Sequence, residues 1–132
     1  MRNVGATNLL HKAMKKHGVS CLVVFGSTAR GEEKRGEDLD LGVLFSKDPS
    51  PADEQNIVKA LTCLLPEEIL DIAVLNHASP LLNFHVARDG KVLFEARKGD
   101  FLRFKMRAVH QYWDTARFRK MLETFALREV LP

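Results

Sequence analysis

Two aspartates separated by one residue, Asp38 and Asp40, open the apolar run 39–45. In a β-strand, residues i and i+2 share a face and lie about 6.6 Å apart. Carboxylates beside a buried strand are costly unless a cation compensates them. Mg²⁺ prefers oxygen ligands and is often used in phosphoryl chemistry. The pair therefore predicts a Mg²⁺ site.

The dipeptide Gly26-Ser27 follows the short apolar run 22–25. Glycine lets the backbone turn sharply and approach a ligand closely. Serine is a good N-cap, and a helix N-terminus presents unpaired N–H groups to anions. A Gly-Ser opening is by itself a common cap, and Asp-x-Asp is by itself usually a solvated turn. Together they predict a triphosphate-binding turn that leads into a metal-binding strand.

Asp71 interrupts the apolar run 69–75, which is otherwise typical of a buried strand. Aspartate is depleted from strand interiors, so something should compensate its charge. One interpretation is an aspartate held by backbone donors near the start of a strand. The other places Asp71 beside the Asp38/Asp40 strand, where it completes the metal site and accepts or orients the proton of an attacking hydroxyl.

Three basic residues, Arg30, Lys34 and Arg35, follow the predicted phosphate turn. They could neutralise triphosphate charge, with Arg30 closest in sequence to Ser27, or they could be ordinary exposed loop charges. The five histidines show no spacing that favours a zinc site.

Length and composition favour one compact domain. The chain has 132 residues and is 45% apolar, enough for a sizeable core. We treat 1–132 as a single domain, with a catalytic core over 1–98 and a C-terminal helical segment over 99–132. The net charge of +3 is too modest to indicate direct nucleic-acid binding.

The chain shows no signal-peptide pattern and no apolar run near the ~20 residues of a membrane span. Cys21 and Cys63 both lie in apolar surroundings, so we expect reduced core cysteines. We therefore expect a cytoplasmic protein without a membrane partner.

Periodicity predicts alternating elements and a fold of the α/β (α+β) class, a small mixed β-sheet packed with helices. Ser50 is a candidate N-cap for the helix that follows Pro51. The expected helices span 6–17, 27–33, 52–64 and 80–88, and the expected strands span 20–25, 38–45, 69–75 and 91–95.

The C-terminal segment from Asp100 to Arg128 contains neither glycine nor proline, which allows one helix about 43 Å long. Its apolar residues form two stripes, so it should be buried on more than one side. One stripe can cover the sheet, while the other, with Tyr112 or Trp113, would suit a protein partner. Two shorter helices folded onto the core are the alternative. The stripes are Leu102, Met106, Val109, Trp113 and Ala116, and Phe101, Phe104, Ala108 and Tyr112 leading toward Leu122 and Phe125.

The order Gly26-Ser27, a spacer, then Asp38-Leu39-Asp40 resembles the nucleotidyltransferase superfamily of the DNA polymerase β type. Within it, the short chain and the segments 69–76, 79–82 and 90–95 resemble the minimal nucleotidyltransferase antitoxins of the MntA type. The similarity covers roughly residues 8–125. One departure is Glu37, where this group often has serine, which adds a negative charge beside the site.

This resemblance implies a polymerase β-type fold and transfer of AMP from ATP to a hydroxyl, with release of pyrophosphate. It implies Mg²⁺ ligands at Asp38, Asp40 and Asp71, and a grip on the β- and γ-phosphates by Gly26 and Ser27. The implied acceptor is a tyrosine of a partner HEPN-family toxin, a ribonuclease that AMPylation silences.

Two alternatives remain open. The protein could be a non-catalytic antitoxin that neutralises the toxin by forming a complex through its C-terminal helix. It could also adenylylate a small molecule, although 132 residues leave little room for an extra substrate domain. A second copy of the chain, as a homo-oligomer, stays a further partner hypothesis.

Overall fold

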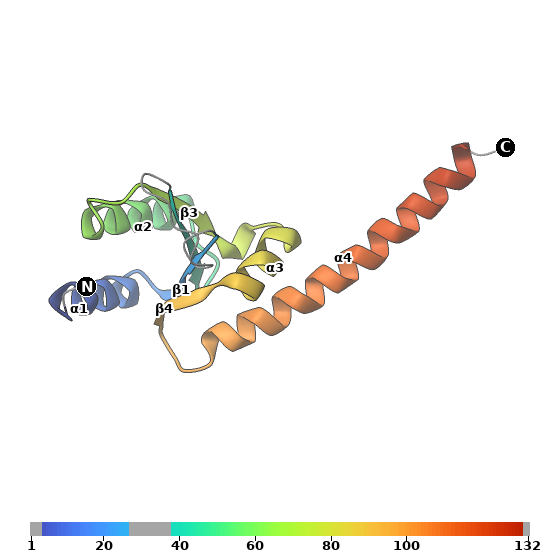
Figure 1. The fold of residues 1–132 in the computed structure, drawn as a ribbon. Coiled ribbons are helices and arrows are strands. Elements are labelled where there is room, and N and C mark those ends of the chain that lie inside the picture. Colours follow the sequence, from blue (N-terminus) through green and yellow to red (C-terminus); the bar gives the residue numbers. More distant parts are fainter. Residues whose placement is uncertain (1–3, 27–37, 131–132) are drawn as a thin grey trace.

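The computed structural model describes residues 4–26 and 38–130, and within them helices and strands alternate as expected. The expected helix 27–33 lies outside the described residues. The elements are α1 (Val4–Lys16), β1 (Val19–Phe25), β2 (Leu39–Phe45), α2 (Pro51–Leu64), β3 (Leu70–Val74), the 3₁₀ turn η1 (Leu75–His77), α3 (Pro80–Asp89), β4 (Lys91–Glu95) and α4 (Asp100–Val130) (Figure 1).

The four strands form one sheet in the order β3-β2-β1-β4. Strand β1 pairs antiparallel with β2 and β4, whereas β2 and β3 are parallel. The predicted mixed sheet with helices against it is therefore confirmed. The parallel pairing brings the starts of β2 and β3 to one edge of the sheet, where the antiparallel β1 ends.

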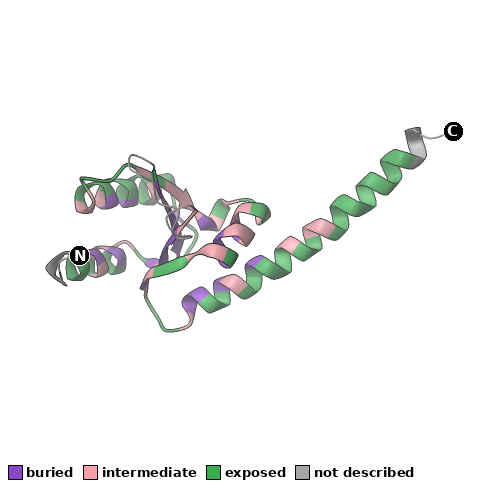
Figure 2. Cartoon of the chain, in the orientation of Figure 1, coloured by how far each residue is buried: buried purple, intermediate pink, exposed green. Residues whose placement is uncertain are grey.

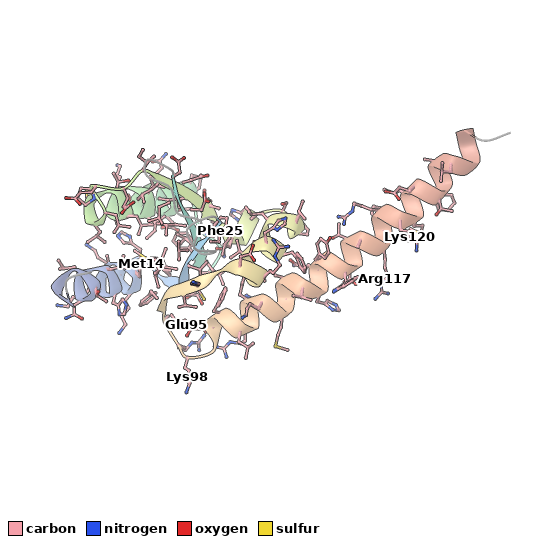
Figure 3. The ribbon with its side chains drawn as sticks, viewed as in Figure 1. Met14, Phe25, Glu95, Lys98, Arg117 and Lys120 are labelled. Carbon is pink, nitrogen blue, oxygen red and sulfur yellow. The ribbon has the colours of Figure 1, made fainter. Side chains whose placement is uncertain are left out.

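Helices cover both faces of this sheet (Figures 1 and 3). Because successive side chains of a strand point to opposite faces, β1, β2 and β3 each contribute to two separate cores. The core under α1 and α2 includes Met14, Leu22, Leu41, Ile57 and Leu61. The core under α3 and the beginning of α4 includes Val23, Leu44, Val86, Phe101 and Phe104.

The start of α2 confirms the prediction made for Ser50. Its side chain accepts a hydrogen bond from the Asp53 backbone N–H at 3.1 Å, and the Asp53 carboxylate accepts one from the Ser50 N–H at 2.9 Å. This reciprocal pair is a capping box, and Pro51 at the first helical position adds a preset φ angle.

Helix α4 is a single helix of 31 residues, so the alternative of two shorter helices is wrong. Its first turns pack on the sheet through the buried Phe101, Phe104 and Ala108. Tyr112 then stacks on Phe84 of α3, with ring centroids 4.1 Å apart. Beyond that contact α4 leaves the body of the protein, and its residues 117–127 are exposed (Figures 1 and 2).

The cysteine prediction holds for one residue and is wrong for the other. Cys21 is buried in β1, whereas Cys63 is exposed near the end of α2. An apolar neighbourhood in the sequence does not decide which side of a helix a residue occupies.

In the part of the chain that the structure describes, no helix has the length and apolar character needed to cross a bilayer.

Candidate active site

The predicted site residues converge at the edge of the sheet where β1 ends and where β2 and β3 begin. Phe25 is the register partner of Asp40 on β2, and Asp40 is in turn the register partner of Asp71 on β3. Three segments that are far apart in the sequence thus meet in one row across the sheet.

Asp40 and Asp71 lie side by side on neighbouring parallel strands, which are about 4.8 Å apart. Both side chains belong to the face that α3 and α4 cover, because Leu39, Leu41, Leu70 and Ile72 all pack on the opposite face. Asp71 is exposed and Asp40 is half-buried. The interpretation of Asp71 as a residue beside the Asp-x-Asp strand agrees with this register.

Asp38 lies just before β2 and is exposed. The next residue, Leu39, donates its backbone N–H to the carbonyl of Ile69 at 2.7 Å, which ties the start of β2 to the start of β3. Over residues 4–26 and 38–130, no group of three or more His, Cys, Asp or Glu side chains is arranged to hold a metal ion. Metal ligation by Asp38, Asp40 and Asp71 together therefore stays a prediction.

Gly26 makes the turn at the end of β1 with φ at 75°, a conformation that L side chains rarely adopt. A Cβ atom at this position would collide with Oδ2 of Asp40. The sharp turn predicted for Gly26 is confirmed, whereas its predicted approach to a phosphate ligand stays a prediction. Ser27 and Arg30, together with Lys34, Arg35 and Glu37, lie outside the described residues, so their roles stay predictions.

These residues suit a divalent cation. Asp40 and Asp71 supply hard oxygen donors at one edge, and the space around Gly26 is kept free of a side chain on the side of Asp40. Mg²⁺ is typically bound through one or two carboxylates, with the remaining positions taken by water and substrate phosphates. The donor set fits that pattern.

One basic residue at this edge was missed by the sequence analysis. Lys91 begins β4 and is the register partner of Val24, so it lies on the strand beside β1 near the Gly26 turn. It is exposed. Strand alternation predicted β4 correctly, but nothing in the sequence showed that β4 would pair with β1.

His77 lies away from this edge. It is the last residue of η1, at the other end of the sheet, where its Nε2 is 2.6 Å from Asp48 Oδ1. That hydrogen bond, helped by Glu54, raises the pKa of His77. His85 contacts Arg88 on α3.

The family model described as "Polymerase beta, Nucleotidyltransferase" matches residues 8–99. The chain belongs to this nucleotidyltransferase family. The resemblance in the Gly-Ser and Asp-x-Asp segments is thereby confirmed, and so is the assignment as a nucleotidyltransferase.

One curated relative is the protein adenylyltransferase MntA of Aphanizomenon flos-aquae, which is 34% identical over 97 residues. The match covers 67% of this chain and 65% of that protein, so the nucleotidyltransferase spans about two thirds of its relative's length.

Solved structures of similar fold include a toxin–antitoxin complex with AMP-PNP, at a TM-score of 0.72 and 22% identity over 92% of this chain and 98% of that one. Another is a tri-AMPylated Shewanella oneidensis HEPN toxin in complex with an MNT antitoxin, at a TM-score of 0.66 and 20% identity, covering 92% and 96%. At these identities the likeness concerns the fold. It extends over most of this chain and confirms the polymerase β-type architecture.

Proposed function

We propose that this nucleotidyltransferase moves AMP from ATP to a tyrosine hydroxyl of a HEPN-family toxin and so acts as its antitoxin. The observation that carries the proposal is that the Gly26 turn lies against Asp40, which is itself the register partner of Asp71, so that a tight backbone turn stands beside two adjacent carboxylates. The similarity to a protein adenylyltransferase supports the choice of AMP and of a protein acceptor.

In the proposed reaction, the acceptor oxygen forms a bond to the α-phosphorus of ATP. The bond from that phosphorus to the oxygen of the β-phosphate breaks, and pyrophosphate leaves. Asp71 is exposed at the edge, so its carboxylate can accept or orient the hydroxyl proton. Gly26 and Ser27 would hold the β- and γ-phosphates, and Arg30 would neutralise part of their charge.

Mg²⁺ would be held by Asp38, Asp40 and Asp71. When bound, it supplies a positive charge that stabilises the negative charge developing on the phosphoryl oxygens. The chain's own contribution is to fix Asp40 and Asp71 by strand register, so that little reorganisation is needed when substrate binds.

The test is AMP transfer from α-labelled ATP, with Mg²⁺ present or chelated, to a purified HEPN-family toxin. Asp40→Asn and Asp71→Asn should abolish transfer while the thermal melt persists, because removing adjacent like charges does not disrupt the fold. Asp48→Asn, an exposed aspartate beyond the other end of β2, is the matched control and should transfer normally. Full transfer by an Asp40→Asn/Asp71→Asn double variant would overturn the proposal.

A second candidate is a stoichiometric antitoxin that works by binding alone. It is favoured by the large apolar side chains that α4 exposes, among them Trp113 at 58% and Phe118 at 55%. An enzyme should silence its partner durably when substoichiometric, and the partner should gain the mass of one or more AMP units. Inhibition only at equimolar ratio, with unmodified partner despite ATP and Mg²⁺, would favour the binder.

A further inference from the structure

A cavity of about 620 Å³ lies at the end of the sheet opposite the carboxylates. Its walls come from the end of β2, the turn η1, the first turn of α3 and one side of α4. The α4 wall is formed by Arg107, Gln111 and Asp114 together with Phe104, Ala108 and Thr115.

The wall contains the buried side-chain amide of Asn83, whose oxygen receives no hydrogen bond from the described residues. Asn83 is 7% exposed, and its Nδ2 donates to the carbonyl of Leu75 at 3.3 Å. That bond fixes the orientation of the amide, and Oδ1 has no partner among the described residues. Buried polar atoms are normally hydrogen-bonded, so this acceptor indicates a donor supplied from within the cavity.

The cavity side of α4 continues outward as an apolar stripe. The residues on this side are Arg107, Gln111, Asp114, Phe118, Met121, Leu122 and Phe125. From Arg107 to Met121 they follow one another at intervals of three or four residues, and so do Phe118, Leu122 and Phe125, which places all seven on one side of the helix. The last four extend beyond α3 with exposed fractions of 55, 49, 50 and 54%. We call the side defined by these seven residues the outer face of α4.

The net charge of α4 indicates which kind of partner should cover its outer face. Residues 100–130 contain seven basic and four acidic residues, so α4 carries the chain's whole net charge of +3. Arg117 and Arg119 precede and follow Phe118, so they lie about 100° to either side of it. Arg117 is labelled on the part of α4 that extends beyond α3 (Figure 3). A second copy of α4 would set like charges against each other.

We propose that the outer face of α4 and the adjoining cavity form the docking surface for the protein partner. The partner would contribute an amphipathic helix with an apolar centre and carboxylates at its margins, and one hydrogen-bond donor reaching Asn83 Oδ1. The identity of that partner as the HEPN protein rests on the proposed function.

A partner docked on the outer face of α4 would leave the carboxylates Asp40 and Asp71 accessible. The cavity and the carboxylates lie on the same face of the sheet, because Asp40 and Leu44 have the same strand parity. Leu44, at the cavity, is four residues after Asp40 along β2, which corresponds to a distance of about 13 Å. A partner held at the cavity could therefore extend a second segment to the carboxylates. Docking variants should raise the KM for the partner and leave kcat largely unchanged.

A second apolar stripe, on the side of α4 turned away from the cavity, provides the comparison. It consists of Leu102, Met106, Val109 and Trp113, all of them exposed. It adjoins neither the cavity nor Asn83, so we do not expect it to hold the partner. Trp113→Asp is therefore the matched control for substitutions in the outer face.

The experiment is titration calorimetry of the full chain against the same purified HEPN-family toxin. Phe118→Asp/Leu122→Asp should weaken binding at least about 30-fold, since interface energy concentrates in a few buried anchors. Arg107→Glu, an exposed position at the cavity wall, should weaken it about tenfold by placing a carboxylate against an acidic partner. Trp113→Asp should bind within about threefold of the wild type.

Several outcomes would overturn the proposal. Binding lost only in Trp113→Asp would place the interface on the other stripe. If the wild type is a dimer and the Phe118→Asp/Leu122→Asp variant is a monomer, the outer face of α4 is covered by a second copy of the chain. Binding of a labelled single-stranded RNA that Arg117→Glu/Arg119→Glu abolishes, with unchanged affinity for the HEPN protein, would make the surface a nucleic-acid site.

AMP transfer separates this proposal from the proposed function. If the outer-face variants bind normally and transfer persists, the docking surface is wrong and the adenylyltransferase stands. If the wild type binds the HEPN protein through this face but transfers no AMP, the docking surface stands and the adenylyltransferase is wrong.

Discussion

The carboxylate of Asp40 occupies the space that a side chain at Gly26 would need. The two residues lie on neighbouring strands, since Asp40 is the register partner of Phe25. The conformation of the turn and the position of the carboxylate are therefore coupled. A change at Gly26 should affect both the turn and the metal-binding edge.

Gly26→Ala should lower stability and abolish activity together. The positive φ of 75° would cost an alanine roughly 1–2 kcal/mol. Its Cβ would also push Asp40 aside, and displacements of about 1 Å can reduce catalysis roughly 100-fold. Urea unfolding and AMP transfer measured on the same preparation test both effects.

Gly18→Ala is the control, because Gly18 has a φ of 71° and nothing within 4 Å of an added Cβ. It should show a similar loss of stability with normal transfer below the melting temperature. Equal transfer by the two variants would mean that the Gly26–Asp40 contact does not position the carboxylate.

Much of this edge was predictable because its signals are local. Glycine before serine marks the turn, and Asp-x-Asp opens a buried strand. Pairing is not local, because the register of Asp40 with Asp71 depends on 30 intervening residues, which include the rest of β2, α2 and its flanking loops. The elements and the acidic residues were therefore predictable, while the order of the strands across the sheet needed the structure.

Asn76 is predicted to stabilise the far end of the sheet. Strand β3 gives way to η1 after Val74, and the Asn76 side chain then takes the place of a strand backbone. It accepts a hydrogen bond from the Phe45 N–H at 2.8 Å and donates one to the Phe45 carbonyl at 3.1 Å. Asn76→Ala leaves both groups without these partners and should cost about 2 kcal/mol in the free energy of unfolding.

Asn56→Ala, at an exposed position on α2, should leave the stability unchanged or slightly higher, because alanine favours helix. Denaturant melts of both variants decide the matter. An Asn76→Ala variant as stable as the wild type would show that water replaces both hydrogen bonds.

The two cysteines should differ in reactivity. Burial raises the pKa of the Cys21 thiol to about 11, so at pH 8 only roughly one thiol in a thousand is ionised. Cys63 is exposed. Iodoacetamide at pH 8 should add one adduct to the native protein, on Cys63, and a second only after unfolding. A Cys63→Ser variant that reacts in the native state would contradict this assignment.

The length of α4 was predictable, but its burial was not. A run without glycine or proline allows a long helix, but the sequence left open which of the two stripes covers the sheet. The structure places Phe101, Phe104 and Ala108 there. Tyr112 was a candidate partner contact from the sequence, yet it stacks on Phe84 within the chain. Periodicity shows which residues share a side of a helix, and it cannot show where a neighbouring element ends.

Asp100, at the start of α4, should make stability depend on pH. Burial opposes its ionisation, but hydrogen bonds from Arg103 and from the Arg97 backbone N–H outweigh that effect and lower the pKa of Asp100. A folded-state pKa below the unfolded one stabilises the protein above the ordinary value near 4. That contribution is lost as the pH falls through the lowered pKa.

Asp100→Asn should therefore destabilise the protein at pH 7 by about 1.5–3 kcal/mol, the range for hydrogen bonds to a charged group. The difference from the wild type should shrink as the pH falls from about 4 through the lowered folded-state pKa of Asp100, below which this carboxyl is protonated in both the folded and the unfolded protein. Urea melts across pH 3 to 7 measure this, with Asp114→Asn, an exposed aspartate on the same helix, as the control. A difference that stays constant over the whole range would mean that the Asp100 side chain acts through packing, because a neutral contribution would not titrate.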